Sequence, residues 1–100
     1  MKIIFTEDAE ENIKKIWEFN CLFNKLFAQR IQKSIYKDIR TLSKYPKSGH
    51  IEELLKNKPD EYRSLVVAGG RYKVIYAEKV NYIVIHVVFD CRSNPDKIEA

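Results

Sequence analysis

The hydrophobic period changes once along the chain, and this change constrains the fold more than any other feature. Up to about residue 44, apolar residues recur every three or four positions, as on one face of a helix; from residue 61 they recur every second position, as on a strand. One hundred residues is the size of one domain. We therefore expect residues 1–100 to form a single α+β domain of two layers, with helices packed on one sheet.

The helical part divides into two helices after a short strand at 2–5. Thr6 is a good N-cap and acidic residues follow it in the first turn, which predicts a helix over about 7–20. A second helix is predicted over 22–44 and should end before Tyr45-Pro46, because the residue before a proline disfavours the helical conformation. The apolar stripe of this second helix is Phe23, Phe27, Ile31, Ile35, Ile39 and Leu42.

The remainder predicts a three-stranded antiparallel meander with strands at 61–68, 71–77 and 82–90. Glycines at Ala68-Gly69-Gly70 suit a tight hairpin turn, and 78–81 should form the second turn. Residues 50–60 are ambiguous and could form a short helical turn. Two helices can cover only one face of such a sheet, so we expect the other face to be open.

The last strand, NYIVIHVVFDCR at 81–92, fixes the expected pairing. Its alternate residues form two series: Ile83, Ile85, Val87 and Phe89, and Val84, His86, Val88, Asp90 and Arg92. A turn with an even number of residues pairs Ala77 with Tyr82, and then places Lys73 opposite His86 and Arg71 opposite Val88. The first series then shares a core face with Tyr72, Val74 and Tyr76, whereas an odd turn would bury Lys73 and Arg71.

This register predicts a polar cluster on the open face. Its members are Arg71, Lys73, His86, Asp90 and, beyond the strand end, Arg92. Clustered cations suit a phosphate, and a histidine suits proton transfer. An ordinary solvated cross-strand cluster is the alternative. Arg63 falls with Leu65 and Val67 on the helix side if the glycine turn is even, and a bulge would move it to the open face.

A second basic surface follows the second helix. Arg30, Lys33, Lys37, Arg40 and Lys44 share one side of that helix, nearly opposite its apolar stripe. The side could bind a nucleic-acid backbone or an acidic partner segment, or it could simply face solvent. The net charge of +4 favours an anionic partner only mildly.

Several classes of site and location have no signal in the sequence. The chain contains no phosphate-binding loop, zinc motif or nucleophile elbow, so we expect no metal and no cofactor. The two cysteines, Cys21 and Cys91, suggest reduced thiols, with Cys91 expected to be a small buried residue. There is no signal peptide and no apolar run long enough to span a membrane, so a cytoplasmic protein is expected.

Several segments, in order, resemble the RelE/ParE superfamily of toxins from type II toxin–antitoxin (plasmid stabilisation) systems. They are FTEDAEENIKKIWEF, LSKYPKSGH and EYRSLVVAGGRYKVIYAEKVNYIVIHVVFDCRSNP, which together span nearly the whole chain. The resemblance implies a growth-inhibiting toxin that is neutralised by an antitoxin encoded beside it. That partner would be an acidic and apolar segment that folds on binding.

Two routes to toxicity follow from the resemblance, and a third outcome is an inactive member that only binds antitoxin. RelE-like members cleave messenger RNA on the ribosome; Lys73 and Arg92 match the family's basic positions, with His86 and Asp90 as a possible acid–base pair and Arg71 and Arg63 as phosphate ligands. ParE-like members inhibit DNA gyrase without catalysis, here through the tail 92–100 or the basic helix. The chain departs from the ribonuclease pattern because Ser64 and Val66 stand where lysines are expected and no tyrosine or histidine follows Arg92.

Overall fold

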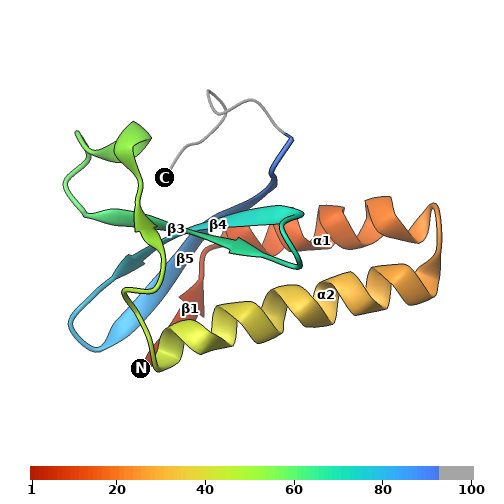
Figure 1. Ribbon diagram of the computed structural model, residues 1–100, viewed down its shortest axis with the longest axis horizontal. Helices are drawn as coiled ribbons and strands as arrows, with labels where there is room; N and C mark the ends of the chain where they lie inside the picture. Colours follow the sequence, from red (N-terminus) through yellow and green to blue (C-terminus); the bar gives the residue numbers. More distant parts are fainter. Residues whose placement is uncertain (93–100) are drawn as a thin grey trace.

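The computed structural model describes residues 1–92, apart from the side chain of Leu54. Two helices follow a first strand, and the remaining strands come after them (Figure 1). The elements are β1 (Lys2–Phe5), α1 (Glu7–Cys21), α2 (Lys25–Arg40), η1 (Thr41–Ser43), β2 (His50–Ile51), η2 (Glu53–Leu55), β3 (Tyr62–Val67), β4 (Tyr72–Glu78) and β5 (Tyr82–Asp90). The predicted α+β fold with an N-terminal strand, a helical hairpin and a meander is confirmed.

One mixed sheet contains all five strands, in the order β1-β5-β4-β3-β2. The meander β3-β4-β5 is antiparallel, and β1 lies parallel to β5 at one edge. The two-residue strand β2, which the sequence did not reveal, pairs with Arg63 and Ser64 at the other edge. A strand this short has no hydrophobic period, so only its pairing identifies it.

The main core lies between the sheet and the two helices. The apolar stripe of α2 meets the helix-facing side chains of the strands, among them Val67, Val74, Tyr76, Ile83 and Ile85. Ala9 and Ile13 add the contribution of α1. Each helix begins with a side-chain cap, the predicted Thr6 for α1 and Asn24, which was not predicted, for α2. Each cap side chain accepts a hydrogen bond from a backbone N–H in the first turn.

Two differences overturn the predicted register: the turn shifts the pairing of β4 with β5 by two residues, and a β-bulge lies further along β5. Tyr76 pairs with Ile85 but Ile75 pairs with Val87, so His86 is an extra residue in the ladder. The pairing of Ala77 with Tyr82 is wrong, because Ala77 pairs with Val84; Lys73 lies opposite Phe89 rather than His86. The pairing of Arg71 with Val88 is wrong as well, because Val88 pairs with Val74.

The bulge also exchanges the faces of the second half of β5. Ile83 and Ile85 face the helices as predicted, but Val87 and Phe89 face the other way, and Val88 enters the main core in their place. The face of the sheet that points away from α1 and α2 is called the second face below.

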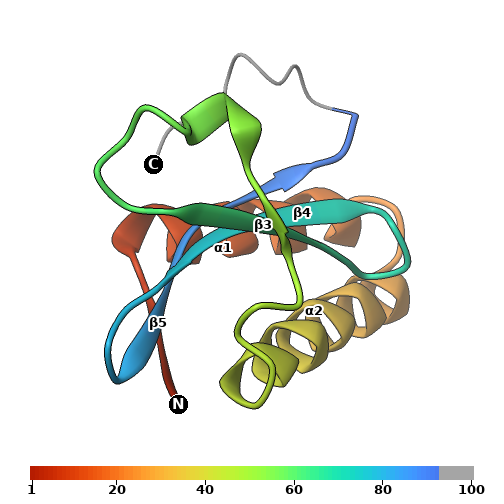
Figure 2. The same cartoon turned by 60° about the vertical axis from the view of Figure 1, so that its left-hand side comes forward.

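The second face is not open, and that prediction is wrong. Residues 50–61, which include η2, cross it on the side opposite to α2 (Figure 2). Leu55 is buried there with Tyr62, Ile75 and Ala77, and Val87 and Phe89 pack against them. A small second core therefore occupies much of the surface on which an exposed polar site was expected.

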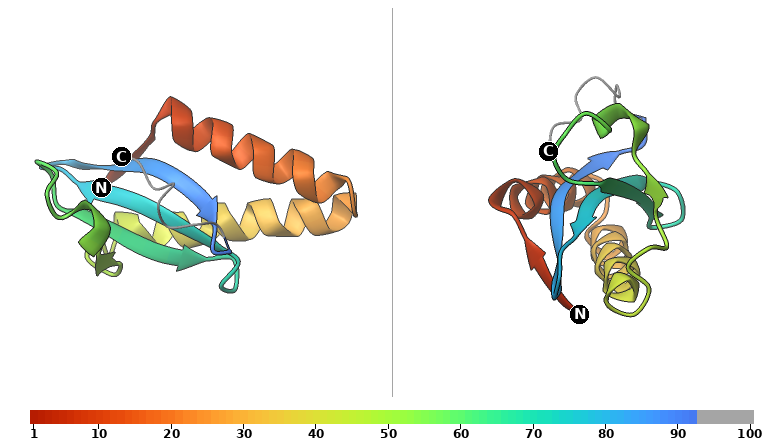
Figure 3. Two further views of the ribbon diagram at one scale, coloured as in Figure 1. Left: turned by 90° about the horizontal axis from the view of Figure 1, so that it is seen from above. Right: turned by 90° about the vertical axis from the view of Figure 1, so that its left-hand side faces the viewer.

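The helical hairpin is longer than the sheet it covers. The turn between α1 and α2 projects beyond the strand ends and forms one end of the molecule (Figures 1 and 3). The second helix starts at Lys25 rather than 22, because Asn24 caps it, and its last predicted turn is the short helix η1. Phe23, predicted to be in the core, is 73% exposed, since no strand reaches it.

The Thr6 hydroxyl gives a direct test of how the bulge is held. It donates to the carbonyl oxygen of His86 at 2.8 Å and accepts from the backbone N–H of Ala9 at 3.0 Å. Losing an N-cap costs about 1 kcal/mol, and an unsatisfied bulge carbonyl adds about 1 kcal/mol or more. We expect Thr6→Ala to lower the free energy of unfolding, measured in urea, by more than Asn24→Ala does, because Asn24 caps α2 alone.

Thr6→Ser keeps the hydroxyl and serves as the control for Thr6→Ala. Its free energy of unfolding should stay close to that of the wild type. Equal losses for Thr6→Ala and Asn24→Ala would show that the bond to the bulge contributes nothing.

Candidate functional site

Lys73 lies on the second face of β4, beside Phe89 of the neighbouring strand. Its ammonium group is 3.4 Å from a carboxylate oxygen of Glu52, whose side chain is only 8% exposed. The segment that crosses the second face thus brings an acid to the lysine. This contact neutralises the charge that a phosphate would need.

His86 occupies the bulge and is partly covered by Tyr62, with the two rings edge to face at 5.0 Å between centroids. Its Nε2 atom is buried and has no hydrogen-bond partner among residues 1–92. Burial lowers the pKa of His86 below its ordinary value of 6.5, and the charge of Lys79 lowers it further, while Asp60 opposes them. The imidazole is therefore neutral near pH 7 and packs against Tyr62 of β3.

Asp90 and Arg92 form a pair of their own beyond the bulge. Two side-chain contacts of 3.0 and 2.7 Å join the guanidinium to the carboxylate. These hydrogen bonds lower the pKa of Asp90. Asp90 pairs with Tyr72, which faces the helices, so the bulge has moved this acid away from the face that His86 and Lys73 share.

Arg71 lies near that pair, at the turn between β3 and β4. Its guanidinium carbon is 5.3 Å from the centre of the Phe27 ring of α2, a cation–π contact on the helix side of the sheet. A depression of about 560 Å³ lies here and includes Asn20, the glycine turn, Cys91 and Arg92 in its lining. Cys91 is exposed rather than buried as predicted, because β5 ends at Asp90.

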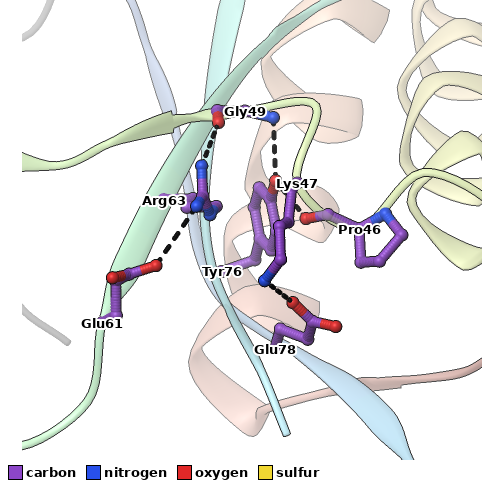
Figure 4. A network of polar contacts seen from close by, with 7 residues as sticks. All are labelled: Pro46, Lys47, Gly49, Glu61, Arg63, Tyr76 and Glu78. Atoms are coloured by element: carbon purple, nitrogen blue, oxygen red, sulfur yellow. Dashed lines mark hydrogen bonds and ion pairs between the residues drawn. The ribbon is translucent and has the colours of Figure 1, made fainter.

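Arg63 is held in a structural network at the other end of β3. It lies opposite Tyr76, on the helix side, as an even turn at Gly69-Gly70 predicts. Its guanidinium donates to the carbonyl oxygen of Gly49 at 2.9 Å and contacts Glu61 at 3.2 Å (Figure 4). The buried Tyr76 hydroxyl donates to Pro46 and accepts from the N–H of Gly49. Arg63 therefore fastens the loop that enters β2.

The six predicted site residues thus lie in three places instead of one. Lys73 and His86 are on the second face, Arg71 joins the Asp90–Arg92 pair at the end of β5, and Arg63 belongs to the loop network. Each of the four cations contacts an acid, a carbonyl oxygen or an aromatic ring. No two of them converge on a common acceptor position in the described contacts of residues 1–92.

A different surface combines charge with an apolar floor. The outer side of the helical hairpin has a groove of about 880 Å³. Its lining joins two aromatic rings, two amides and three cations: Trp17, Tyr36, Gln29, Gln32, Lys33, Lys37 and Arg40. The predicted basic side of α2 supplies the cations. The role of the aromatic rings was missed, because Trp17 has the helical spacing of the buried residues Ile13 and Asn20 and is itself only half-buried.

Residues 1–92 contain neither a cluster of metal ligands nor a membrane-spanning helix. No group of three or more His, Cys, Asp or Glu side chains is placed to hold a metal ion. None of the described helices has the length and apolar content needed to cross a membrane.

The buried imidazole predicts a dependence of stability on pH. Because the folded-state pKa of His86 lies below 6.5, the unfolded chain binds the proton first as pH falls. This residue's contribution to stability is therefore complete above pH 6.5 and is lost progressively below it. We expect the difference in free energy of unfolding between the wild type and His86→Phe to shift against the wild type as the pH is lowered from about 8 to about 5.5.

His86→Asn separates protonation from side-chain size in this experiment. It keeps a hydrogen-bonding group but cannot take a proton, so it should lose the same part of the pH dependence as His86→Phe. A difference that stays constant across this pH range for both variants would contradict the assignment.

Comparison with known proteins agrees with the fold. A family model described as the ParE toxin of type II toxin–antitoxin system, parDE, matches residues 3–93. Among solved structures, the chain is similar to one described as the chromosomal ParDE TA system from P. aeruginosa, with a TM-score of 0.74 and 15% sequence identity over 90% of this chain and 95% of that chain. At this identity the similarity concerns the fold alone. A search of curated proteins finds no match.

Proposed function

The chain belongs to the ParE toxin family of type II toxin–antitoxin systems, and from that premise we propose that it stops growth by binding DNA gyrase rather than by cutting messenger RNA. The observation that carries this proposal is the dispersal of the four basic candidates for a ribonuclease site. A metal-independent ribonuclease has to gather cations around one phosphate and place an acid and a base beside it.

The observed side-chain contacts support neither the gathered cations nor the acid and base that a ribonuclease needs. Lys73 is engaged by the nearly buried Glu52, and Arg92 by Asp90. His86 shares a face with Lys73 but is covered by Tyr62, and the bulge separates it from Asp90. Binding a protein target needs no such constellation, because an exposed surface of suitable shape is sufficient.

Growth and enzyme assays distinguish the two routes. We expect arrest on induction of the wild type, of Lys73→Ala and of Arg92→Ala, with no new in-frame messenger ends by reverse-transcription mapping. The purified wild-type protein should inhibit supercoiling by gyrase at micromolar concentration. His86→Ala tests the remaining catalytic candidate and should also arrest growth.

New messenger ends that disappear in Lys73→Ala or His86→Ala would instead establish a ribonuclease on the second face. Arrest with neither messenger cuts nor gyrase inhibition would rule out both routes. Absence of arrest in a natural host would identify an inactive family member.

We propose that the groove on the outer side of the hairpin binds the antitoxin. Its cations Lys33, Lys37 and Arg40 would attract an acidic segment, and Trp17 and Tyr36 offer an apolar floor. A groove between two helices suits a third, amphipathic helix that folds as it binds. The antitoxin encoded beside this gene should therefore carry an acidic and apolar segment.

Charge reversal in the groove tests this assignment. We expect Lys33→Glu/Lys37→Glu to escape neutralisation when co-expressed with the antitoxin, because two attractions become repulsions, while arrest by the toxin alone persists. Lys56→Glu/Lys58→Glu is the matched control, since these exposed lysines lie in the segment that crosses the second face. Growth on co-expression is the measurement, and full neutralisation of the Lys33→Glu/Lys37→Glu variant would exclude the groove.

A further inference from the structure

The turn of the helical hairpin carries an apolar patch that the fold leaves uncovered. Five large side chains contribute to it: Phe19 (51% exposed), Leu22 (81%), Phe23 (73%), Leu26 (66%) and Phe27 (37%). They are called the tip patch below. The apolar stripe of α2 continues past the end of the sheet, so its first part has no strand to pack on.

The tip patch is continuous across the turn. The rings of Phe19 and Phe23 contact each other edge to face, with 5.2 Å between centroids. Leu22 and Leu26, which follow along the turn, are four residues apart, and Phe27 closes the patch against Arg71. The turn that carries these residues projects beyond the strands and lies at one end of the molecule (Figures 1 and 3).

Few charges lie within the turn segment itself, although Arg71 of the sheet contacts Phe27. Residues 19–27, FNCLFNKLF, contain one charged residue, Lys25. The rest of α2 carries its basic residues along the outer side, at Arg30, Lys33, Lys37 and Arg40. Two copies of this basic chain would repel each other side by side, but they can meet end to end through the tip patch.

We propose that the tip patch is an interface with a second copy of this chain, formed by two hairpin ends related by a two-fold axis. A two-fold contact needs a surface that complements itself, and an uncharged cluster of phenylalanine and leucine meets this condition. At ~200 Å² for a large side chain, the exposed fractions correspond to about 600 Å² on each copy and about 1,200 Å² in the pair. This lies at the lower end of specific interfaces, which is the range of weak, reversible complexes.

Two other occupants fit the tip patch less well. An acidic antitoxin segment is drawn to cations, and these line the hairpin groove rather than the tip. A membrane-binding face combines apolar residues with several lysines or arginines, whereas this end has Lys25 alone between residues 19 and 27.

Sedimentation equilibrium of the purified chain, from low to high micromolar concentration and with a reductant to keep Cys21 reduced, tests the dimer. We expect a reversible monomer–dimer equilibrium in the wild type. Leu22→Asp places a carboxylate at the centre of the contact and should weaken association at least about tenfold. Val80→Asp is the matched control: Val80 is 88% exposed in the turn between β4 and β5, and its replacement should leave association unchanged.

Circular dichroism verifies that both variants are folded, which is expected because both side chains are exposed. A monomer at all concentrations, or equal association of wild type and Leu22→Asp, would overturn the proposal. Flotation with phosphatidylserine vesicles that is lost in Leu22→Asp would assign the patch to a lipid surface instead. Each of these results is independent of the gyrase and messenger assays, so the proposed function can stand or fall separately.

Discussion

One hydroxyl group, that of Thr6, joins the three parts of this fold. It caps α1 by accepting from the N–H of Ala9, and it donates to the carbonyl oxygen of His86 in the bulge of β5. The backbone N–H of Thr6 also donates to the carbonyl oxygen of Ile85, which continues the pairing of β1 with β5. A carbonyl group displaced from a ladder needs another donor. The start of the first helix supplies it, so the bulge and the helix entry depend on each other.

The bulge determines into which of the two cores the apolar side chains of each half of β5 pack. Before it, Ile83 and Ile85 complete the main core; after it, Val87 and Phe89 turn to the second face and form the small core with Leu55 and Tyr62. Both alternating series of β5 are rich in apolar residues because the strand packs against a core on each side of the sheet. The polar residues follow this division: His86 stays on the second face, while Asp90 reaches the helix side and pairs with Arg92.

The sequence was sufficient to predict the two long helices, the strands β1, β3, β4 and β5 and the fold class, because the two hydrophobic periods and the cap at Thr6 are local signals. It was insufficient for the register of β5. Both alternating series of that strand contain valines, so the hydrophobic pattern looks the same with or without a one-residue bulge. The second face was mispredicted for a related reason: Leu55 lies in an irregular segment, and it packs on Ile75 and Ala77, which are distant in sequence. The predicted site assumed a regular register in β5 and an open second face. Because neither is found, its residues lie in separate places.

The length of the hairpin relative to the sheet separates the remaining surfaces by chemistry. Along α2, Ile31, Ile35 and Ile39 are buried against the sheet, whereas Phe23, in the turn before the helix, stays exposed. The outer side of the same helix faces away from the sheet, and its cations line a groove together with Trp17 of α1. One helix thus presents a buried stripe, a basic groove and an apolar end, and each suits a different contact. Partners that differ in charge can then occupy the groove and the tip patch at the same time, because the two surfaces share no lining residue.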